Sequence, residues 1–314
     1  MSADTAIMAN GPAMSTAEFD ALYDRLAGSV GPRTGYGALS ALDDAARLEA
    51  ARLVRTGQVV SLALPINRHP APDNARPALH HMVDRTDIEG PEPTANKDFI
   101  GLDYHGKAVT HLDALCHIAY RGRLHDGAIS REVVSSNGSS HFPVSDLATG
   151  VVTRGVLVDA AHARGVDWLD PGTAVHADDL LAAEKELDVQ LSPGDALLLR
   201  SGHVARRAAL GPWNPDASSA GLHPSAMELV AERGIALLGG DGDSDVRPSP
   251  VEGVSSPVHV LALTALGIPL LDNLDLERLA LACREQARHT FLLVVAPLVV
   301  PGGTGSPVNP LAML

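Results

Sequence analysis

Cysteine, aromatic residues and positive charge are all scarce in this 314-residue chain. Its two cysteines, Cys116 and Cys283, are too few for a disulfide framework. With 24 basic against 38 acidic residues, the net charge of −14 argues against a surface for nucleic acid or anionic membranes, because both are bound by clustered lysine and arginine. Four Phe, four Tyr and two Trp leave little material for stacking an aryl ligand.

Long apolar runs and leader-like segments are also missing from the sequence. No run approaches the roughly 18 to 20 residues that a membrane-spanning helix needs. No charged start followed by an apolar stretch marks a secretion signal. We therefore expect a cytoplasmic protein, and its 45% hydrophobic content is ample for a buried core.

Apolar runs of strand length alternate with helical patterns through most of the chain. The runs lie at residues 59–64, 151–158, 196–200, 235–238, 268–271 and 291–300. The helical patterns begin at Ser15 and recur at residues 41–55, 177–186, 225–233, 258–266 and 276–288. Near-continuous apolar strands suit burial on both faces. The alternation predicts an α/β fold, with a mixed sheet of buried strands flanked by helices.

The sequence offers few boundaries for dividing the chain. No repeat, low-complexity tract or glycine-rich linker is present, so we predict a single domain over residues 15–314, preceded by a flexible N-terminus at 1–14. Residues 68–97 are rich in Pro, His and Asp and have no periodicity. They are predicted to form a long loop, and such loops are often functional lids or subunit arms.

The segment from residue 104 to 117 concentrates imidazole and carboxylate side chains. On an extended segment, His111 and Asp113 project to the same face, and a turn after Asp113 brings His117 back toward them. Divalent ions such as Zn²⁺ or Mn²⁺ bind imidazole nitrogen and carboxylate oxygen together. The pattern predicts a metal site, although fourteen histidines in the chain also make chance pairs at short spacing expected.

This segment resembles the signature of the cyclase family that includes bacterial kynurenine formamidase and isatin hydrolase, which reads His-x-Gly-Thr-His-x-Asp-x-Pro-x-His. The matching residues are Thr110, His111, Asp113 and His117. The departures are Lys107 for the first histidine, Val109 for the glycine and Leu115 for the proline. The resemblance extends from about Val59 to the C-terminus and implies the swivelling β/α type of fold.

The resemblance also implies a ligand set. His111 and Asp113 match metal ligands of the family, and His259 and Asp272 match a late histidine and glutamate that are both on the metal, with aspartate here for glutamate. We therefore predict one or two divalent ions, zinc or manganese.

Lys107 is the serious departure, because a protonated ammonium cannot donate a lone pair to a cation. Either the site has fewer ligands, or His105, which shares the parity of His111, supplies the missing nitrogen. An ordinary surface histidine is the alternative for His105.

The resemblance implies proton transfer for His117, whose alternatives are a third metal ligand or a partner of a ligand. Lys107 is predicted to pair with a substrate carboxylate or a developing oxyanion. Two further residues follow strands and are predicted to bind substrate. These are His203, for which a surface histidine is the alternative, and Asp241, with Asp243 as an equivalent choice.

The resemblance implies a metal-dependent hydrolase that opens a cyclic amide, imide or lactone, or cleaves an N-acyl amide. Two alternatives stay open. One is a metal-independent cyclase, dehydratase or isomerase of a secondary-metabolite pathway that uses His117 and Lys107 for acid–base work. The other is a catalytically silent binding protein of the same fold. The expected partners are a small-molecule substrate and further copies of the chain in a homodimer or homotetramer.

Overall fold

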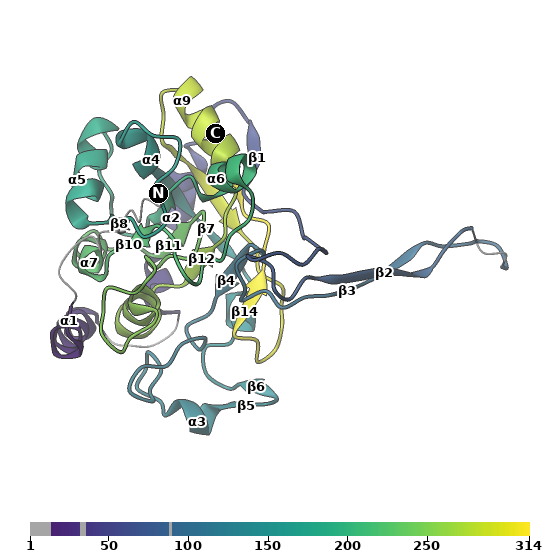
Figure 1. Ribbon diagram of the computed structural model, residues 1–314, viewed down its shortest axis with the longest axis horizontal. Helices are drawn as coiled ribbons and strands as arrows, with labels where there is room; N and C mark the ends of the chain where they lie inside the picture. Colours follow the sequence, from purple (N-terminus) through teal and green to yellow (C-terminus); the bar gives the residue numbers. More distant parts are fainter. Residues whose placement is uncertain (1–13, 32–35, 88–89) are drawn as a thin grey trace, which may run out of the picture.

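The computed structural model describes residues 14–31, 36–87 and 90–314. Among these residues, nine strands form one sheet in the order β1-β15-β13-β7-β9-β11-β12-β4-β14 (Figure 1). In sheet order the strands are Val59–Ser61, Leu311–Met313, Thr290–Val295, Val151–Asp159, Ala196–Arg200, Leu237–Gly240, Leu270–Asp272, His111–Asp113 and Gly305–Pro307. β7, β9, β11 and β12 run parallel, and the outer strands pair antiparallel. The predicted mixed α/β fold is confirmed.

Helices cover both faces of this sheet. The helices of the described residues are α1 (Thr16–Ser29), α2 (Asp44–Ala51), α3 (Ser130–Val133), α4 (Ala160–Ala163), α5 (Ala177–Glu186), α6 (His203–Leu210), α7 (Met227–Glu232), α8 (Pro257–His259) and α9 (Glu277–Glu285). The 3₁₀ segments are η1 (Gly37–Ala41), η2 (Val144–Leu147) and η3 (Pro224–Ala226), and η4 (Val260–Leu266) is a π-helix that continues α8. Three short strand pairs complete the structure: β8 (Ala174–Val175) with β10 (Gly221–Leu222), β5 (Val134–Ser135) with β6 (Gly138–Ser139), and β2 with β3. Of the helices, α3 lies beside the separate strand pair of β5 and β6.

The central strands are apolar on both sides because each side faces its own core. Along β7, Val156 and Val158 pack into one cluster with α1, α5 and α7, whereas Leu157 between them packs into the other with α9. The predicted burial on both faces is therefore confirmed. The last run is shorter than the predicted 291–300: β13 ends at Val295, and Pro297 has no N–H to continue the ladder.

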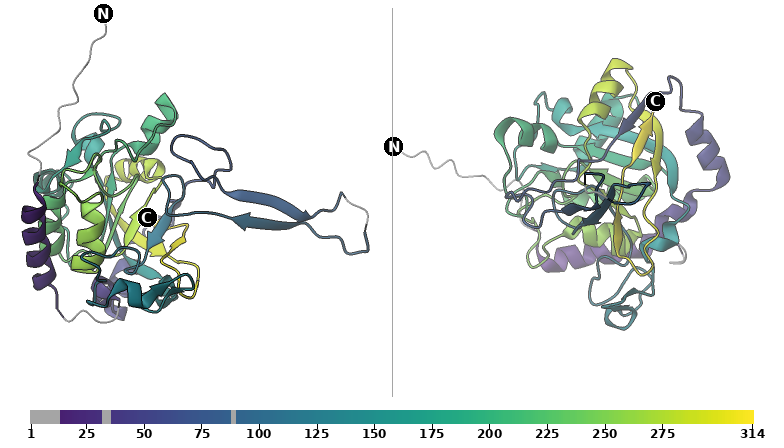
Figure 2. Two further views of the ribbon diagram at one scale, coloured as in Figure 1. Left: turned by 60° about the horizontal axis from the view of Figure 1, so that its bottom comes forward. Right: turned by 90° about the vertical axis from the view of Figure 1, so that its right-hand side faces the viewer.

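The largest departure from the sequence prediction is an arm that we define as residues 79–87 and 90–101. Within the predicted long loop of residues 68–97, β2 (Leu79–Asp84) pairs antiparallel with β3 (Lys97–Gly101). The arm projects far from the body of the molecule (Figures 1 and 2). Its apolar side chains, including Val83, Phe99 and Ile100, are about half exposed. Strands without a buried face need not alternate in polarity, which is why periodicity did not reveal them.

The N-terminal prediction falls mostly outside the described residues, which begin at Met14. Met14 itself donates its N–H to the carbonyl of Pro250, and Ser15 caps α1 through a capping box with Glu18. Within the described parts of the chain, no helix has the length and apolar character required to span a membrane.

Candidate metal centre

The register of the sheet brings the predicted metal ligands together. His111 and Asp113 stand two residues apart on β4 and face the same side. Asp272 on β12 is the direct cross-strand partner of His111, so its side chain joins the same face. His259 enters from α8, with its Nε2 3.2 Å from Asp272 Oδ2. Four residues spread over 162 positions of sequence thus meet at one point.

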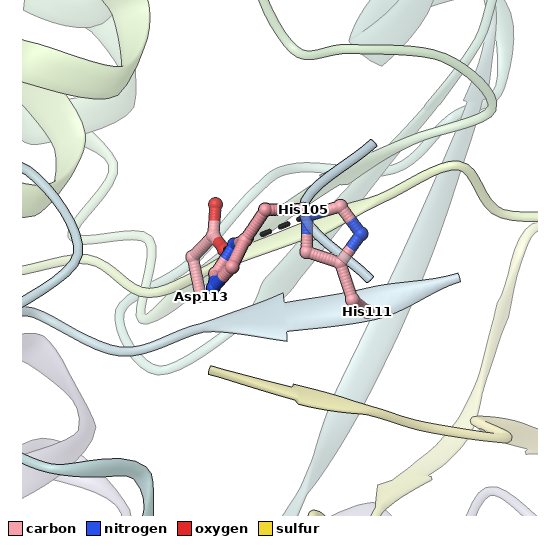
Figure 3. Close-up of side chains that lie close together, drawn as sticks. All are labelled: His105, His111 and Asp113. Atoms are coloured by element: carbon pink, nitrogen blue, oxygen red, sulfur yellow. Dashed lines mark ion pairs between the residues drawn. The ribbon is translucent and has the colours of Figure 1, made fainter. Parts of the chain in front are cut away.

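Asp113 lies at the centre of this group. Its carboxylate is fully buried, with Oδ1 2.9 Å from Nδ1 of His105 and 3.5 Å from Nε2 of His111 (Figure 3). Oδ2 lies 3.7 Å from Nε2 of His259 and 3.9 Å from Nε2 of His117. None of these contacts has the alignment of a hydrogen bond, so both oxygens are buried without a donor. A buried carboxylate in that state requires a positive charge beside it.

The surrounding imidazoles are oriented by their outer nitrogens. Nδ1 of His111 lies 2.9 Å from the Val109 carbonyl, and Nδ1 of His259 lies 2.6 Å from Asp245 Oδ2. Because these oxygens only accept, each Nδ1 carries the proton and donates it, which leaves Nε2 directed at the carboxylates. Metal-binding histidines are typically held in this way.

Lys107 stands where the family motif has its first histidine, and the imidazole nearest to Asp113 comes instead from His105. Its Nε2 lies 3.1 Å from Thr304 Oγ1, and with Nε2–H donating there, the lone pair of Nδ1 is directed toward Asp113. The ring fits because Gly305 has no side chain: a Cβ there would lie 2.8 Å from His105 Cε1. The His105 side chain is partly buried, with 23% of its surface exposed.

Asp245 is not among the site residues predicted from the sequence, yet it positions His259. Its carboxylate accepts the backbone N–H groups of Val258 and His259 as well as the imidazole proton of His259. The same carboxylate therefore satisfies backbone N–H groups in the first turn of α8 and orients the imidazole of His259. Burial opposes protonation of His259, but Asp272, Asp243 and Asp245 together raise its pKa well above the ordinary value. Position 259 thus attracts positive charge, either a proton or a metal ion.

Lys107 faces away from this group toward Asp243. Its Nζ donates to Asp243 Oδ2 at 2.5 Å, and Nε of Arg247 donates to the same oxygen at 2.7 Å. Burial lowers the pKa of Lys107, but the charge of Asp243 outweighs it, so the pKa is raised overall. The ammonium is therefore charged and cannot act as a ligand, and a metal-independent role as a base is disfavoured.

His117 stacks face to face on His105, with ring centroids 4.0 Å apart and planes within 2°. Its side chain is 23% exposed. Burial lowers its pKa to about 4 even though Asp113 opposes the shift. The imidazole is consequently neutral near pH 7 and has a lone pair available to accept a proton.

His203 and Asp241, the predicted substrate-binding residues, line a cavity of about 390 Å³ that also reaches Lys107. The two differ in what they offer. Asp241 accepts hydrogen bonds from the Ser201 hydroxyl and from the backbone N–H groups of Ser201, Gly202 and His203. These four bonds use its oxygens to fix the start of α6, which favours a positioning role. His203 makes no side-chain hydrogen bond with the described residues.

A family model described as "Putative cyclase" matches residues 43–244. The chain belongs to the cyclase family. A solved structure of a novel cyclase is 28% identical, with a TM-score of 0.81, over 93% of this chain and 99% of that chain. Isatin hydrolase A from Labrenzia aggregata, bound to benzyl benzoate, is 23% identical over 84% of this chain and 95% of that one, with a TM-score of 0.60.

A predicted metal-dependent hydrolase from Bacillus stearothermophilus is 17% identical, with a TM-score of 0.50, over 81% of this chain and 97% of that one. At the identities of the two hydrolases, the likeness shows the fold alone. No curated protein matches the sequence significantly. The cyclase family and the swivelling β/α architecture, inferred from the residues around His111, are therefore confirmed.

Proposed function

We propose that this protein is a divalent-metal-dependent hydrolase that opens a cyclic amide, imide or lactone, or cleaves an N-acyl amide. The observation that carries the proposal is the buried Asp113 carboxylate, which accepts no hydrogen bond while imidazole nitrogens face both of its oxygens. Membership of the cyclase family, and a fold shared with isatin hydrolases, support the reaction class.

The donor set fits a divalent ion. Two groups of possible ligands share Asp113: one adds His105 and His111, and the other adds His259 and Asp272. Within each group, the ligand atoms lie within 4.8 Å of one another. Mixed imidazole and carboxylate donors suit zinc or manganese. Because the two groups approach different oxygens of Asp113, the proposal covers either one ion or two.

A bound divalent cation supplies a Lewis acid for the substrate carbonyl and lowers the pKa of water. His117 accepts one proton from the attacking water, whose oxygen bonds to the carbonyl carbon. The same imidazole returns the proton to the leaving nitrogen or oxygen as the bond to carbon breaks, so that the acid and the amine or alcohol balance the water consumed. Lys107, held by Asp243, contributes positive charge and no proton transfer.

Metal analysis and hydrolysis by one preparation test this function. Protein treated with chelator should lose hydrolysis of lactones, cyclic imides and N-formyl amides, and stoichiometric Zn²⁺ or Mn²⁺ should restore it. His117→Ala should lower kcat by about 10²- to 10⁴-fold. His141→Ala is the matched control, because His141 is paired with Asp126 and is not one of the candidate ligands. Turnover that persists in chelator, or protein that takes up no divalent ion, would contradict the proposal.

The arm supports a homodimer or homotetramer. A two-stranded hairpin alone is only marginally stable in water, yet this one extends from the body with Leu79, Val83, Phe99 and Ile100 exposed. A second copy of the chain, related by a two-fold axis, would cover these side chains twice through one self-complementary contact. Light scattering should report an oligomer for the wild type and a monomer for the variant carrying Val83→Ser, Phe99→Ser and Ile100→Ser. A monomeric wild type would refute this assembly.

A further inference from the structure

A cavity in the described part of the structure adjoins the candidate metal centre without being part of it. Its volume is about 390 Å³, and Leu64, Pro65, Ile66 and Val204 give it a largely aliphatic wall. A second hollow of about 190 Å³ lies beside His105. The two share Asp73, Lys107 and Ala108 in their walls. A substrate whose reacting carbonyl lies near His105 therefore has room for its remote end in the larger cavity.

The imidazole of His203 is a buried polar group in the wall of this cavity, and the wall also holds the side-chain amide of Asn67. The residue is 8% exposed, and no described residue makes a hydrogen bond to its ring. Its ring packs on Trp213 with centroids 4.4 Å apart, and the guanidinium of Arg206 lies on Trp213 in turn. Burial lowers the pKa of His203 to about 4, so near pH 7 the neutral ring offers one donor and one acceptor.

Apart from Asp275, the charged groups in the wall are already paired or hydrogen-bonded. Lys107 is paired with Asp243, and Arg207 donates to the buried Asp73. Asp241 is occupied by its four donors, as described above. Asp275 accepts only the N–H of Glu277 at the start of α9, so its negative charge faces any incoming anion. An anionic substrate group would have to break an existing pair or approach the like charge of Asp275, and both are costly.

We infer that the 390 Å³ cavity is a specificity pocket for an aliphatic substrate portion that carries one hydrogen-bonding group and no negative charge, and that His203 recognises that group. This inference rests on the proposed function and adds the substrate class. It separates this protein from hydrolases of acyl amino acids, whose substrates bring a carboxylate to the pocket.

Calorimetry on the metal-loaded protein tests the inference with two probes, 4-formamidobutanamide and 4-formamidobutanoate. The probes differ only at the end remote from the formyl group, where one carries a neutral amide and the other a carboxylate. We expect the neutral amide to bind at least about tenfold more tightly than the carboxylate. His203→Leu should weaken binding of the amide by about 5- to 10-fold, the effect of one lost hydrogen bond, while His203→Gln should stay within about threefold of wild type. His223→Leu, at another buried histidine, is the control and should bind as wild type.

The outcomes separate this inference from the proposed function. Equal or tighter binding of the carboxylate, no measurable binding of either probe, or a His203→Leu variant that binds as wild type would each overturn the inference. Hydrolysis of the probes is followed in the same solutions. Hydrolysis without discrimination contradicts the inference alone, whereas discrimination in binding without any hydrolysis contradicts the proposed function alone. Thermal unfolding of each variant confirms that the protein tested is folded.

Discussion

Two carboxylates, Asp113 and Asp243, are buried to nearly the same extent and both face His259, yet the rest of their surroundings differ. Asp243 receives the ammonium of Lys107 and the guanidinium of Arg247. Asp113 receives no hydrogen bond and faces imidazole nitrogens. Both have pKa values held well below the ordinary range despite burial, Asp113 by histidines and Asp243 by His259, Lys107 and Arg247.

The difference indicates which region is suited to a bound cation. Around Asp243 the protein supplies its own positive charge, so the cluster is complete and mainly supports the fold. Around Asp113 the donors are those of a metal ligand set, and the compensating charge comes either from protons on these imidazoles or from a bound cation. We call Asp243 with Lys107 and Arg247 the balanced cluster. Lys107 belongs to this cluster, although its position in the sequence matches a metal ligand of the family.

Asp113→Asn should break the comparison most strongly. The amide keeps the size of the side chain but removes the charge that both groups of candidate ligands share. We expect affinity for Zn²⁺ or Mn²⁺ to fall by more than about 100-fold, beyond the 10- to 100-fold typical of changes to partners of ligands. Calorimetric titration of chelator-treated protein measures the loss. Uptake of metal equal to that of the wild type would show that the ion, if any, binds elsewhere.

Asp243→Asn should have its effect on stability. It leaves two basic side chains, 19% and 12% exposed, without their carboxylate. We expect the free energy of unfolding to fall by about 3 kcal/mol, as when one partner of a buried ion pair is removed. Urea unfolding of metal-free protein measures this, with Asp113→Asn as the comparison. Equal stability of Asp243→Asn and wild type would argue that the cluster is not needed for the fold.

Contacts between residues close in sequence could be predicted, whereas contacts between residues far apart in sequence could not. The period of two along β4 predicted that His111 and Asp113 share a face, because that relation is local. The pairing of Asp272 with His111 is set by sheet register, which spacing alone does not give; the family resemblance indicated only that Asp272 matches a metal ligand. Asp245 and Thr304 act on histidines 14 and 199 residues away. No local pattern marks such contacts, so only the folded structure reveals them.

His105→Gln tests whether His105 belongs to the candidate ligand set around Asp113. The amide keeps a polar side chain of similar size but offers a weaker donor atom than imidazole. We expect about a 10- to 100-fold loss of metal affinity with little change in the unfolding transition of the metal-free protein. Metal content after dialysis at micromolar ion concentration provides the measurement. Full retention of metal would show that His105 is not a ligand and that its ring mainly packs against His117.

The pH dependence of stability should report the neutral state of His203. Its pKa is lowered to about 4 from 6.5, so between these values the unfolded chain binds a proton that the folded protein does not. Its contribution is fully present above pH 6.5 and is lost as pH falls toward 4. For one such group, we expect a loss of about 1 to 2 kcal/mol between pH 7 and pH 5. Urea unfolding of His203→Leu at both pH values should show a smaller difference than wild type. An equal difference would mean that this ring titrates normally.

Substitutions of Lys107 should have the smallest effects on metal affinity and stability. They test whether residue 107 belongs with Asp243 or with the candidate ligands around Asp113. In Lys107→Met, Arg247 still neutralises Asp243, so we expect metal affinity to stay within about threefold of wild type and stability to fall by about 1 kcal/mol. Lys107→His should likewise add no affinity, because His105 already directs a nitrogen at Asp113. A tenfold gain in Lys107→His would mean that position 107 still belongs to the ligand set and that the ammonium displaced a donor. A tenfold loss in Lys107→Met would mean that the balanced cluster shapes the metal centre. Titration of both variants with Zn²⁺ beside His105→Gln distinguishes these outcomes within one experiment.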